Sequence, residues 1–346
     1  MTMLFTDSFD HYTINEMQRK WELVESTSTT SIQASGGRRG GGCWRASSSS
    51  GVRKNLGAGA ATMIVGFAFK VDALSDAATD FVQFLESGVV HMALRVNSNG
   101  SFDVYRGTSL LATSAAGVLS AGAWQYLEFK ATIHDTAGSY YVHVDGVAVL
   151  SNIGSPSTLD TRNVGTSGLV NQVFIGGVTA RIYEFDDLVI LDTAGSRNNN
   201  FLGDIRVDCY RPNGNGNSSQ FVGSDSNSTD NYLLVDDTTP DDDATYVESG
   251  TVGDKDLYAF PAMSHTPASI FAVQALACLK KDDAGSRSAC LQTRSGGTDY
   301  SGSNVALSDS FMYLRELRET DPGGASPDFW HKATFEAAEF GIKVVA

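Results

Sequence analysis

The sequence predicts an all-β protein whose first half is a sandwich of antiparallel strands. Three stretches carry this prediction: WQYLEFKATI from Trp124, YYVHVDGVAVL from Tyr140 and YEFDDLVILD from Tyr183. Apolar and polar residues alternate along them, as on a strand with one buried face. In the second stretch the alternation continues on both sides of Asp145-Gly146. Because Asp-Gly adopts the positive φ angles of a two-residue type I′ turn, a β-hairpin is expected there.

Further strands are expected in regular succession along the first half. Gly, Asn and Ser turns separate them, and no convincing amphipathic helix intervenes. Two packed sheets accommodate so many strands, and a jelly roll is the expected topology. In chain order, the predicted strands are residues 62–71, 79–86, 89–96, 101–107, 124–133, 140–150, 171–177 and 181–192.

The length of 346 residues predicts two domains of ordinary size. We expect a jelly roll over residues 1–192, a linker at 193–202 that contains TAGSRNNN, and a β-rich, sandwich-like domain over 203–346. Residues 213–231 are so poor in apolar side chains that they are expected to form a surface loop. The strands expected in the second domain are 203–212, 254–261, 269–281, 288–297, 311–319 and 340–345, with a short helix or turn at 335–338.

The charge of the chain restricts its partners. A net charge of −15 would repel a phosphate backbone or an anionic membrane over most of the surface, so neither is an expected partner. The longest apolar run, at residues 63–69, is far too short to span a bilayer. The N-terminal MTMLFTDSFD lacks a basic start followed by an apolar stretch, and we expect no cleaved secretory signal.

The order of motifs in the first half resembles the concanavalin A-like or laminin G-like jelly roll. The resemblance covers roughly residues 4–192 and depends on FTDSFD, the W-x-Y-L-E-F strand, the V-D-G hairpin and the final F-D-D-L-V-I strand. Domains of this kind occur in lectins, adhesion proteins, glycosidases and virion proteins. The fold alone therefore leaves the function open.

The second half resembles a class of tailed-bacteriophage structural proteins. The resemblance rests on TAGSRNNNFLGDIRVDCYRPNGNGN, on the acidic segment from Val235, on ALACLKKDDAGSRSACLQTRSGG and on the terminal EFGIKVVA. It implies a non-enzymatic virion protein of the tail, fibre or head surface, assembled in the cytoplasm of the bacterial host. Its partners would be other virion proteins and further copies of this chain. The alternative is a protein that recognises host-surface glycans, and the third reading is a glycan-depolymerising hydrolase.

The hydrolase reading fails at the carboxylate pattern. Glycosidases on this fold place their carboxylates along one strand as E-x-D-x-x-E. Here Glu184 and Asp186 match, but the last position holds Val189. We expect no catalytic residues and no cofactor.

A structural calcium ion is the one metal that the sequence favours. Asp236, Asp237, Asp241, Asp242 and Asp243 crowd into VDDTTPDDD, and Ca²⁺ prefers oxygen ligands of this kind. The spacing does not match an EF-hand, and a solvated acidic turn is the simpler interpretation of the stretch. The histidines are scattered without zinc-ligand spacing.

Two further groups of residues have both a structural and a functional interpretation. Arg38, Arg39 and Arg45 lie in a Gly-rich segment that reads as a loop leading to an inward Trp44, or as an arm that contacts an acidic neighbouring copy. Cys278 and Cys290 are symmetric about Ala284, so a hairpin there would oppose them as two buried residues or as a disulfide.

Glycan-binding residues stay unassigned at this point. Sugar sites use exposed aromatic rings, but aromatic residues on sandwich strands are mostly core. We therefore expect both Trp44 and Trp124 in the core.

Overall fold

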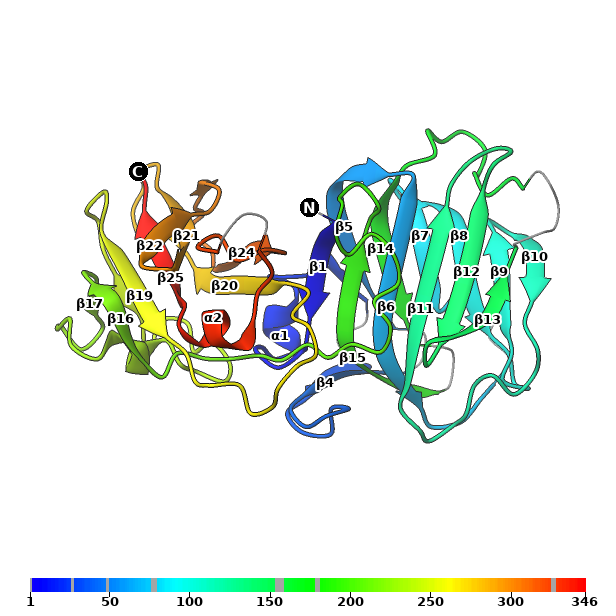
Figure 1. The fold of residues 1–346 in the computed structure, drawn as a ribbon, viewed down its shortest axis with the longest axis horizontal. Helices are drawn as coiled ribbons and strands as arrows, with labels where there is room; N and C mark the ends of the chain where they lie inside the picture. Colours follow the sequence, from blue (N-terminus) through cyan, green and yellow to red (C-terminus); the bar gives the residue numbers. More distant parts are fainter. Residues whose placement is uncertain are drawn as a thin grey trace. The chain divides into compact units, whose positions relative to one another are not determined.

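The computed structural model describes residues 2–25, 28–47, 50–75, 80–152, 159–177, 181–324 and 328–346. It divides into two compact units, unit 1 (Met1–Asp208) and unit 2 (Cys209–Ala346), and the regular structure of both consists mainly of antiparallel strands (Figure 1). In the described residues, the helices are short, and none is long and apolar enough to cross a bilayer.

The first sheet of unit 1 joins strands from the beginning, the middle and the end of the unit. Its strand order is β13-β12-β11-β6-β15-β4-β3, and β1 pairs with the second half of β15. The strands are β1 (Met3–Asp7), β3 (Thr30–Gln33), β4 (Cys43–Ser47), β6 (Thr62–Val71), β11 (Gln125–Thr132), β12 (Ser139–Val144), β13 (Val147–Ser151) and β15 (Ile182–Leu191).

A second sheet of unit 1 has the order β10-β9-β8-β7-β14-β5-β2. The short helix α1 (Ile14–Met17) precedes it along the chain, and a Thr13–Glu16 capping box begins that helix. The strands are β2 (Leu23–Val24), β5 (Gly51–Ala60), β7 (Val82–Glu86), β8 (Val89–Val96), β9 (Phe102–Arg106), β10 (Ser109–Thr113) and β14 (Val170–Gly176).

Aromatic rings fill the space between the two sheets. Phe84 of the second sheet stacks on Phe129 of the first at 4.8 Å, and Phe81 packs against Phe67 and Phe185. These contacts confirm the predicted jelly-roll-like sandwich. The predicted hairpin is also confirmed: β12 and β13 meet at Asp145-Gly146, where φ is 50° and 76°.

The boundary of unit 1 differs from the expected domain limit. The chain beyond β15 does not leave the sandwich at residue 193 but stays with it to Asp208. Amides of this segment bond to side chains of the first sheet, including Leu202 and Gly203 to Glu128. The small polar composition that predicts a linker here cannot reveal that these amides have partners far back in the sequence.

Unit 2 is built around a sheet of order β16-β19-β25-β21-β22, with β23 also paired to β21. The ribbons β17-β18 and β20-β24 accompany it. Its elements are β16 (Gly214–Ser219), β17 (Val222–Gly223), η1 (Asn231–Leu234), β18 (Val247–Glu248), β19 (Lys255–Ala259), β20 (Val273–Leu279), β21 (Ser288–Ser295), β22 (Thr298–Ser301), β23 (Val305–Ala306), β24 (Met312–Arg318), α2 (Lys332–Glu336) and β25 (Glu339–Val344).

The sequence predicts the strands of unit 2 that are rich in apolar residues but misplaces its beginning. Residues 203–212 are not a strand, and the polar stretch 213–231 is not only loop, because β16 and β17 lie within it. Buried Asp256 explains how so polar a segment is held: it accepts hydrogen bonds from Gln220 N, Phe221 N and Asn231 Nδ2. Hydrogen bonds to the Asp256 side chain thus hold this segment in place of the burial of apolar side chains.

The predicted hairpin between Cys278 and Cys290 is wrong. Cys278 pairs with Tyr313 in the β20-β24 ribbon, whereas Cys290 pairs with Lys343 in the larger sheet. Cys290 is a buried free thiol whose sulfur accepts a hydrogen bond from Gln292 Nε2 at 3.2 Å. The symmetry about Ala284 misleads because each strand has a more distant partner along the chain.

Candidate functional site

The outer face of the first sheet collects polar and charged side chains from strands distant in the sequence. Alternation along β11 places Trp124, Tyr126, Glu128 and Lys130 on this face, while Leu127 and Phe129 point into the core. On β15 the same face carries Glu184 and Asp186. The part of the face around Tyr126, Glu128 and Asp186 is buried even though it lies outside the sandwich core.

A bulge in β15 turns two consecutive aspartates to this outer side. The register with β6 shifts between Asp186 and Val189, and Asp187 has a φ of 52°. Asp tolerates this left-handed conformation better than most residues. The backbone N–H of Asp187 donates to Asp186 Oδ1 at 2.8 Å, which holds the Asp186 carboxyl group against the backbone of the bulge.

Burial perturbs both of these carboxyl groups. It raises the pKa of Asp186 to about 8, with a further increase from the negative charge of Asp187. Burial also raises the pKa of Asp187 to about 6, although Val207 N–H and Arg38 oppose the shift. pKa shifts of this size occur both at functional sites and in buried structural networks. The hydrogen-bond and ion-pair partners of the two carboxyl groups therefore indicate which role they have.

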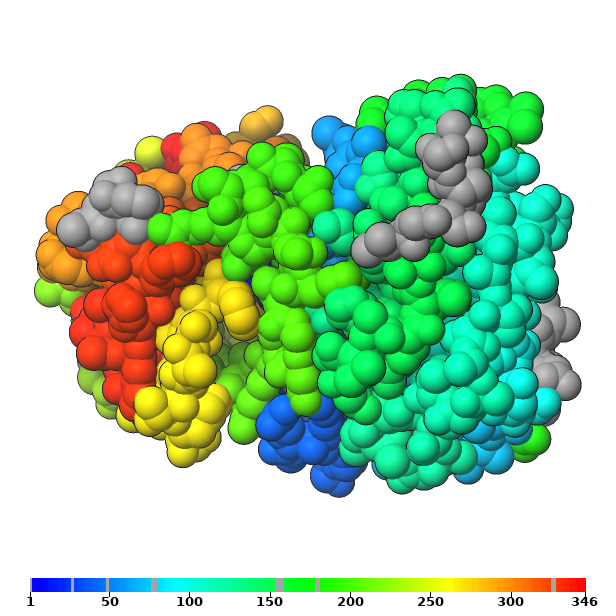
Figure 2. All heavy atoms as spheres, turned by 45° about the vertical axis from the view of Figure 1, so that its right-hand side comes forward, coloured from blue at the N-terminus to red at the C-terminus, as the bar shows by residue number. Residues whose placement is uncertain are grey.

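The Gly-rich loop 36–42 covers Asp186. The Arg38 N–H donates to Asp186 Oδ2 at 2.7 Å, and the Gly42 N–H donates to Asp10 Oδ1. A side chain at Gly37 would lie 2.2 Å from the carbonyl oxygen of Gly42 and 2.9 Å from Asp186 Oδ2, so only glycine fits. In Figure 2 the blue residues of this part of the chain form one patch of the lower surface of unit 1.

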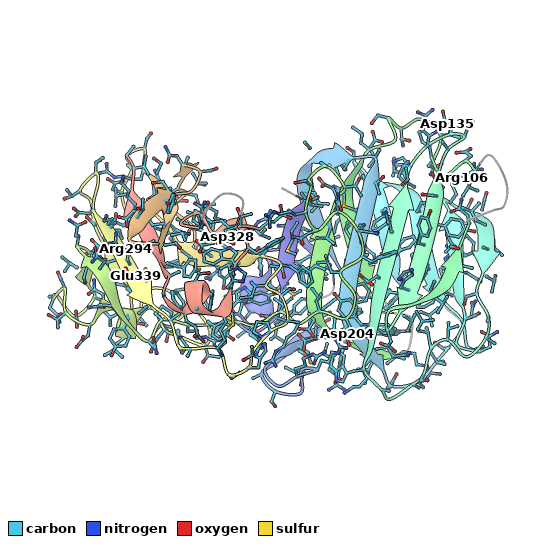
Figure 3. The ribbon with its side chains drawn as sticks, in the orientation of Figure 1. Arg106, Asp135, Asp204, Arg294, Asp328 and Glu339 are labelled. Carbon is cyan, nitrogen blue, oxygen red and sulfur yellow. The ribbon has the colours of Figure 1, made fainter. Side chains whose placement is uncertain are left out.

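The predicted contact arm is folded onto its own unit. Arg38 pairs with Asp187 at 3.5 Å and with Asp204, and Arg39 pairs with Asp204 at 3.2 Å. Asp204 is labelled at the lower edge of unit 1 in Figure 3. Arg45 lies separately on β4. Contact of these arginines with another copy stays a prediction.

The segment 200–207 closes the same face from the other side. Glu128 Oε1 accepts hydrogen bonds from Leu202 N at 2.8 Å and Gly203 N at 3.0 Å, and Asp187 Oδ1 accepts one from Val207 N at 2.7 Å. Burial raises the pKa of Glu128. The buried carboxyl groups of Asp186, Asp187 and Glu128 thus accept hydrogen bonds from backbone amides of the segments that cover them. These contacts hold the covering segments in place, which is a structural role.

An open part of the face lies beside this closed cluster. Lys70, Glu184, Arg45 and Ser31 are directly opposite one another on β6, β15, β4 and β3, and all four are partly exposed. Trp124 continues the row at the β11 end, where the Lys70 ammonium lies 5.2 Å from its ring centroid. We call these five residues the Trp124 row.

The Trp124 row corrects one prediction. Trp44 is fully buried, as expected, and stacks on Phe185 at 4.6 Å. Trp124, however, is partly exposed on the outer face instead of lying in the core. Its alternation with Tyr126, Glu128 and Lys130 is the sequence signal that indicates this side of the strand.

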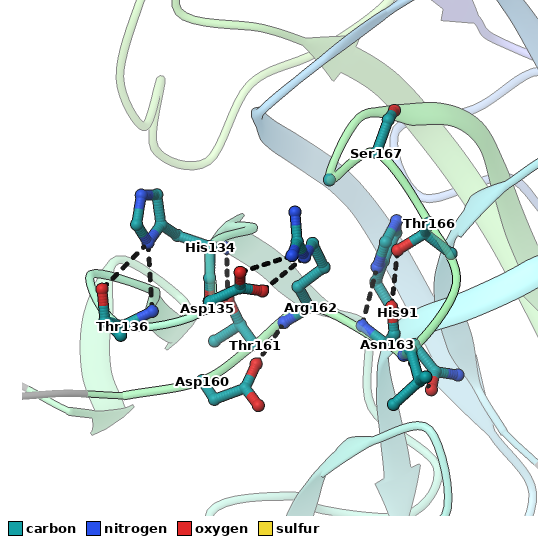
Figure 4. A network of polar contacts seen from close by, with 12 residues as sticks. His91, His134, Asp135, Thr136, Asp160, Thr161, Arg162, Asn163, Thr166 and Ser167 are labelled. Carbon is teal, nitrogen blue, oxygen red and sulfur yellow. Dashed lines mark hydrogen bonds and ion pairs between the residues drawn. The ribbon is translucent and has the colours of Figure 1, made fainter.

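A histidine, a glutamate and a serine meet at another rim of unit 1, part of which Figure 4 shows. Glu86 accepts hydrogen bonds from Ser167 Oγ at 2.7 Å and pairs with His91 Nε2 at 3.2 Å. The serine therefore contacts the carboxylate and not the imidazole, which is the wrong order for activating a nucleophile. Burial acts to raise the pKa of Glu86, but hydrogen bonds from Ser167, Leu169 and Gly168 lower it to about 2. These contacts anchor the loop.

The acidic stretch of unit 2 does not form a metal centre in the described part of the chain, where no group of three or more acidic, His or Cys side chains is arranged to hold an ion. Asp237 and Asp241 both bind Thr245 Oγ1, at 3.3 and 2.9 Å, and Asp243 pairs with Lys280. Their contacts are those of a hydrogen-bonded turn. The stretch comprises Asp236, Asp237, Asp241, Asp242 and Asp243.

Comparison with known proteins gives similarity of fold only. No family model and no curated protein matches the sequence. Among solved structures, the chain is similar to the cellulose-induced protein Cip1, with 16% identity over 52% of this chain and 88% of that one and a TM-score of 0.35. It is also similar to the catalytic domain of a glycoside hydrolase family 131 protein from Coprinopsis cinerea, with 14% identity, 58% and 98% coverage, and a TM-score of 0.36.

A third solved structure with this likeness is the carbohydrate recognition domain of Emp46p. It shares 10% identity over 52% of this chain and 95% of that one, with a TM-score of 0.29. At these identities and scores no activity or ligand carries over to this chain. The virion assignment stays a prediction.

Proposed function

We propose that unit 1 binds a carbohydrate on the outer face of its first sheet, through the Trp124 row. The observation that carries the proposal is a partly exposed tryptophan at the end of a row of polar side chains on adjacent strands. An aromatic face offers the apolar surface that the C–H groups of a sugar ring need, and neighbouring charged groups bind its hydroxyls. This is the combination that carbohydrate sites require.

The proposed binding is without catalysis. The three perturbed carboxyl groups on this face, Asp186, Asp187 and Glu128, already bind the amides of loop 36–42 or of segment 200–207. Glu184, the remaining carboxylate of the predicted pattern, pairs with Lys70. A glycosidase needs two carboxyl groups that reach one glycosidic bond, and the engagement of these four carboxyl groups supports binding without cleavage on this face.

A glycan array followed by calorimetry tests the proposal. We expect wild-type protein to bind at least one glycan, and Trp124→Ala to weaken that binding by about tenfold or more, the loss of roughly 1.4 kcal/mol of stacking. Tyr246→Ala is the matched control, because Tyr246 is an exposed aromatic residue of unit 2. No binding by folded wild-type protein, or equal binding by Trp124→Ala, would contradict the proposal. Release of reducing ends from a bound glycan would overturn its non-catalytic part.

A further inference from the structure

Arg45 has no ion-pair partner among the described residues, even though a glutamate lies directly opposite it in the sheet. The chain has 40 acidic and 25 basic side chains, so carboxylates are abundant. Arg95, Arg106 and Arg162 each pair with an aspartate. Arg45 lies directly opposite Glu184 in the ladder, yet the Glu184 carboxylate pairs with Lys70 on its other side.

The neighbours of Arg45 leave its guanidinium available. On the other side of β4 it faces Ser31, whose hydroxyl accepts a hydrogen bond from Gln33 Nε2 at 2.7 Å. Arg45 is itself partly exposed, and its position within β4 fixes the side of the sheet on which it lies. A guanidinium carries five N–H donors in a planar fork and stays charged, so an unpaired one beside an open surface is a binding group for an anion.

The spacing along the Trp124 row suits an extended ligand. Trp124 and Arg45 are separated by three strand-to-strand steps, from β11 through β6 and β15 to β4. At about 4.8 Å a step, the two positions lie roughly 14 Å apart along the sheet. A chain of several sugar rings laid across the strands would contact Trp124 with one ring and Arg45 with another.

From this arrangement we infer that the glycan bound by the Trp124 row is acidic, with a uronate carboxylate held by the guanidinium of Arg45. The inference rests on the proposed function and names its ligand class. Guanidinium and carboxylate match in a bidentate, charge-assisted pair, which is stronger than a bond to a neutral hydroxyl. The net charge of −15 opposes an anionic ligand elsewhere on the protein, so a local unpaired cation is needed to accept one.

Binding experiments with matched pairs of oligosaccharides can test the uronate assignment separately from the proposed glycan binding. Oligomers of galacturonate, glucuronate, mannuronate and guluronate are each titrated as the uronate and after reduction of every carboxylate to a hydroxymethyl group. Neutral glucans and a sulfated galactan complete the panel. We expect one or more uronates to bind, the reduced form of the same oligomer to bind about tenfold more weakly or worse, and the difference to shrink as salt is raised.

Variants of the full chain assign the effect to Arg45. Arg45→Gln should remove the preference for the uronate while leaving affinity for the reduced form unchanged, whereas Trp124→Ala should weaken both forms. Arg287→Gln is the charge-matched control, since Arg287 forms a surface pair with Asp283 in unit 2. Thermal melting of each variant checks that it is folded.

The possible failures point to different conclusions. If folded wild-type protein binds nothing in the panel, the inference falls, and the proposed function falls with it if the glycan array also shows no binding. If a neutral or reduced oligomer binds as tightly as the uronate, or only the sulfated galactan binds, the glycan site stands and the uronate assignment is wrong. The same conclusion holds if Arg45→Gln weakens both forms equally.

Discussion

At the scale of single residues, burial and backbone geometry determine the chemistry of the outer face. Asp186 and Asp187 reach the same side of β15 only because the chain takes a positive φ at Asp187. Their pKa values are raised to about 8 and about 6, burial being the first cause in both cases. Cys43 is in the same surroundings: burial raises the pKa of its thiol to about 12, and the charges of Glu184 and Asp186 add to the effect.

Asp186 should make stability depend on pH in a definite direction. The folded protein holds its proton up to about pH 8, whereas the unfolded chain releases it near 3.8. The stabilisation from this proton is therefore complete below about pH 4 and is lost as the pH rises through about 8. We expect the free energy of unfolding, from urea titrations between pH 4.5 and 8.5, to fall less steeply in Asp186→Asn than in the wild type.

The comparison of slopes isolates this one group. Other titrating residues contribute to both proteins alike, so the difference between the two curves belongs to Asp186 and the groups coupled to it. Parallel curves over this pH range would show that the carboxyl group of Asp186 is not perturbed as described.

At the scale of elements, the local residue pattern predicts strands, but it does not predict which segments cover the outer face of the sheet. The bounds of β6 and β8 equal the predicted ranges, because both stretches are rich in apolar residues that favour strands. Loop 36–42 and segment 200–207 lack such a pattern, and both are fixed by carboxylates that lie elsewhere in the sequence. Sequence pattern therefore predicts the strongly apolar strands well, but it misses β1, β3, β5 and β10 and predicts the closure of the outer face poorly.

Glu128 should control the segment 200–207. Glu128→Ala removes the acceptor of the Leu202 and Gly203 amides, whereas Glu128→Gln keeps a side-chain oxygen there without the buried charge. We expect hydrogen exchange at these two amides to speed up by about tenfold or more in the alanine variant and to stay near the wild-type rate in the glutamine variant. Unchanged exchange in Glu128→Ala would mean that other contacts hold the segment.

At the scale of the whole molecule, the division after Asp208 assigns the predicted linker to unit 1. Buried Ile205 and the amides bound to Glu128 and Asp187 make residues 197–208 part of the fold of the sandwich. In unit 2 the terminal strand β25 lies between β19 and β21, so the end of the chain is an interior strand of its sheet. The boundaries of the folded parts thus lie where long-range contacts end and not where composition changes.

Truncation tests this boundary. A fragment of residues 1–208 should melt cooperatively, and a fragment of residues 1–192 should melt at least about 4–8 °C lower, equivalent to roughly 2 kcal/mol. The physical reason is that the shorter fragment leaves Glu128 and Asp187 without their amide donors. Circular dichroism at matched concentration measures both, and equal melting temperatures would place the boundary near residue 192 after all.

The residue pattern misses β1, β3, β5 and β10 of the sandwich. It does predict the all-β class, most of the strands between residues 62 and 192, the Asp145-Gly146 hairpin and the inward position of Trp44. These follow from alternation and turn chemistry, which act over a few residues. Only the tertiary structure decided that Trp124 lies on an open outer face, that Cys278 and Cys290 lie in different sheets, and that Arg45 stays unpaired among the described residues. Alternation states which side chains share a face of a strand, but coverage of that face depends on segments brought from far along the chain.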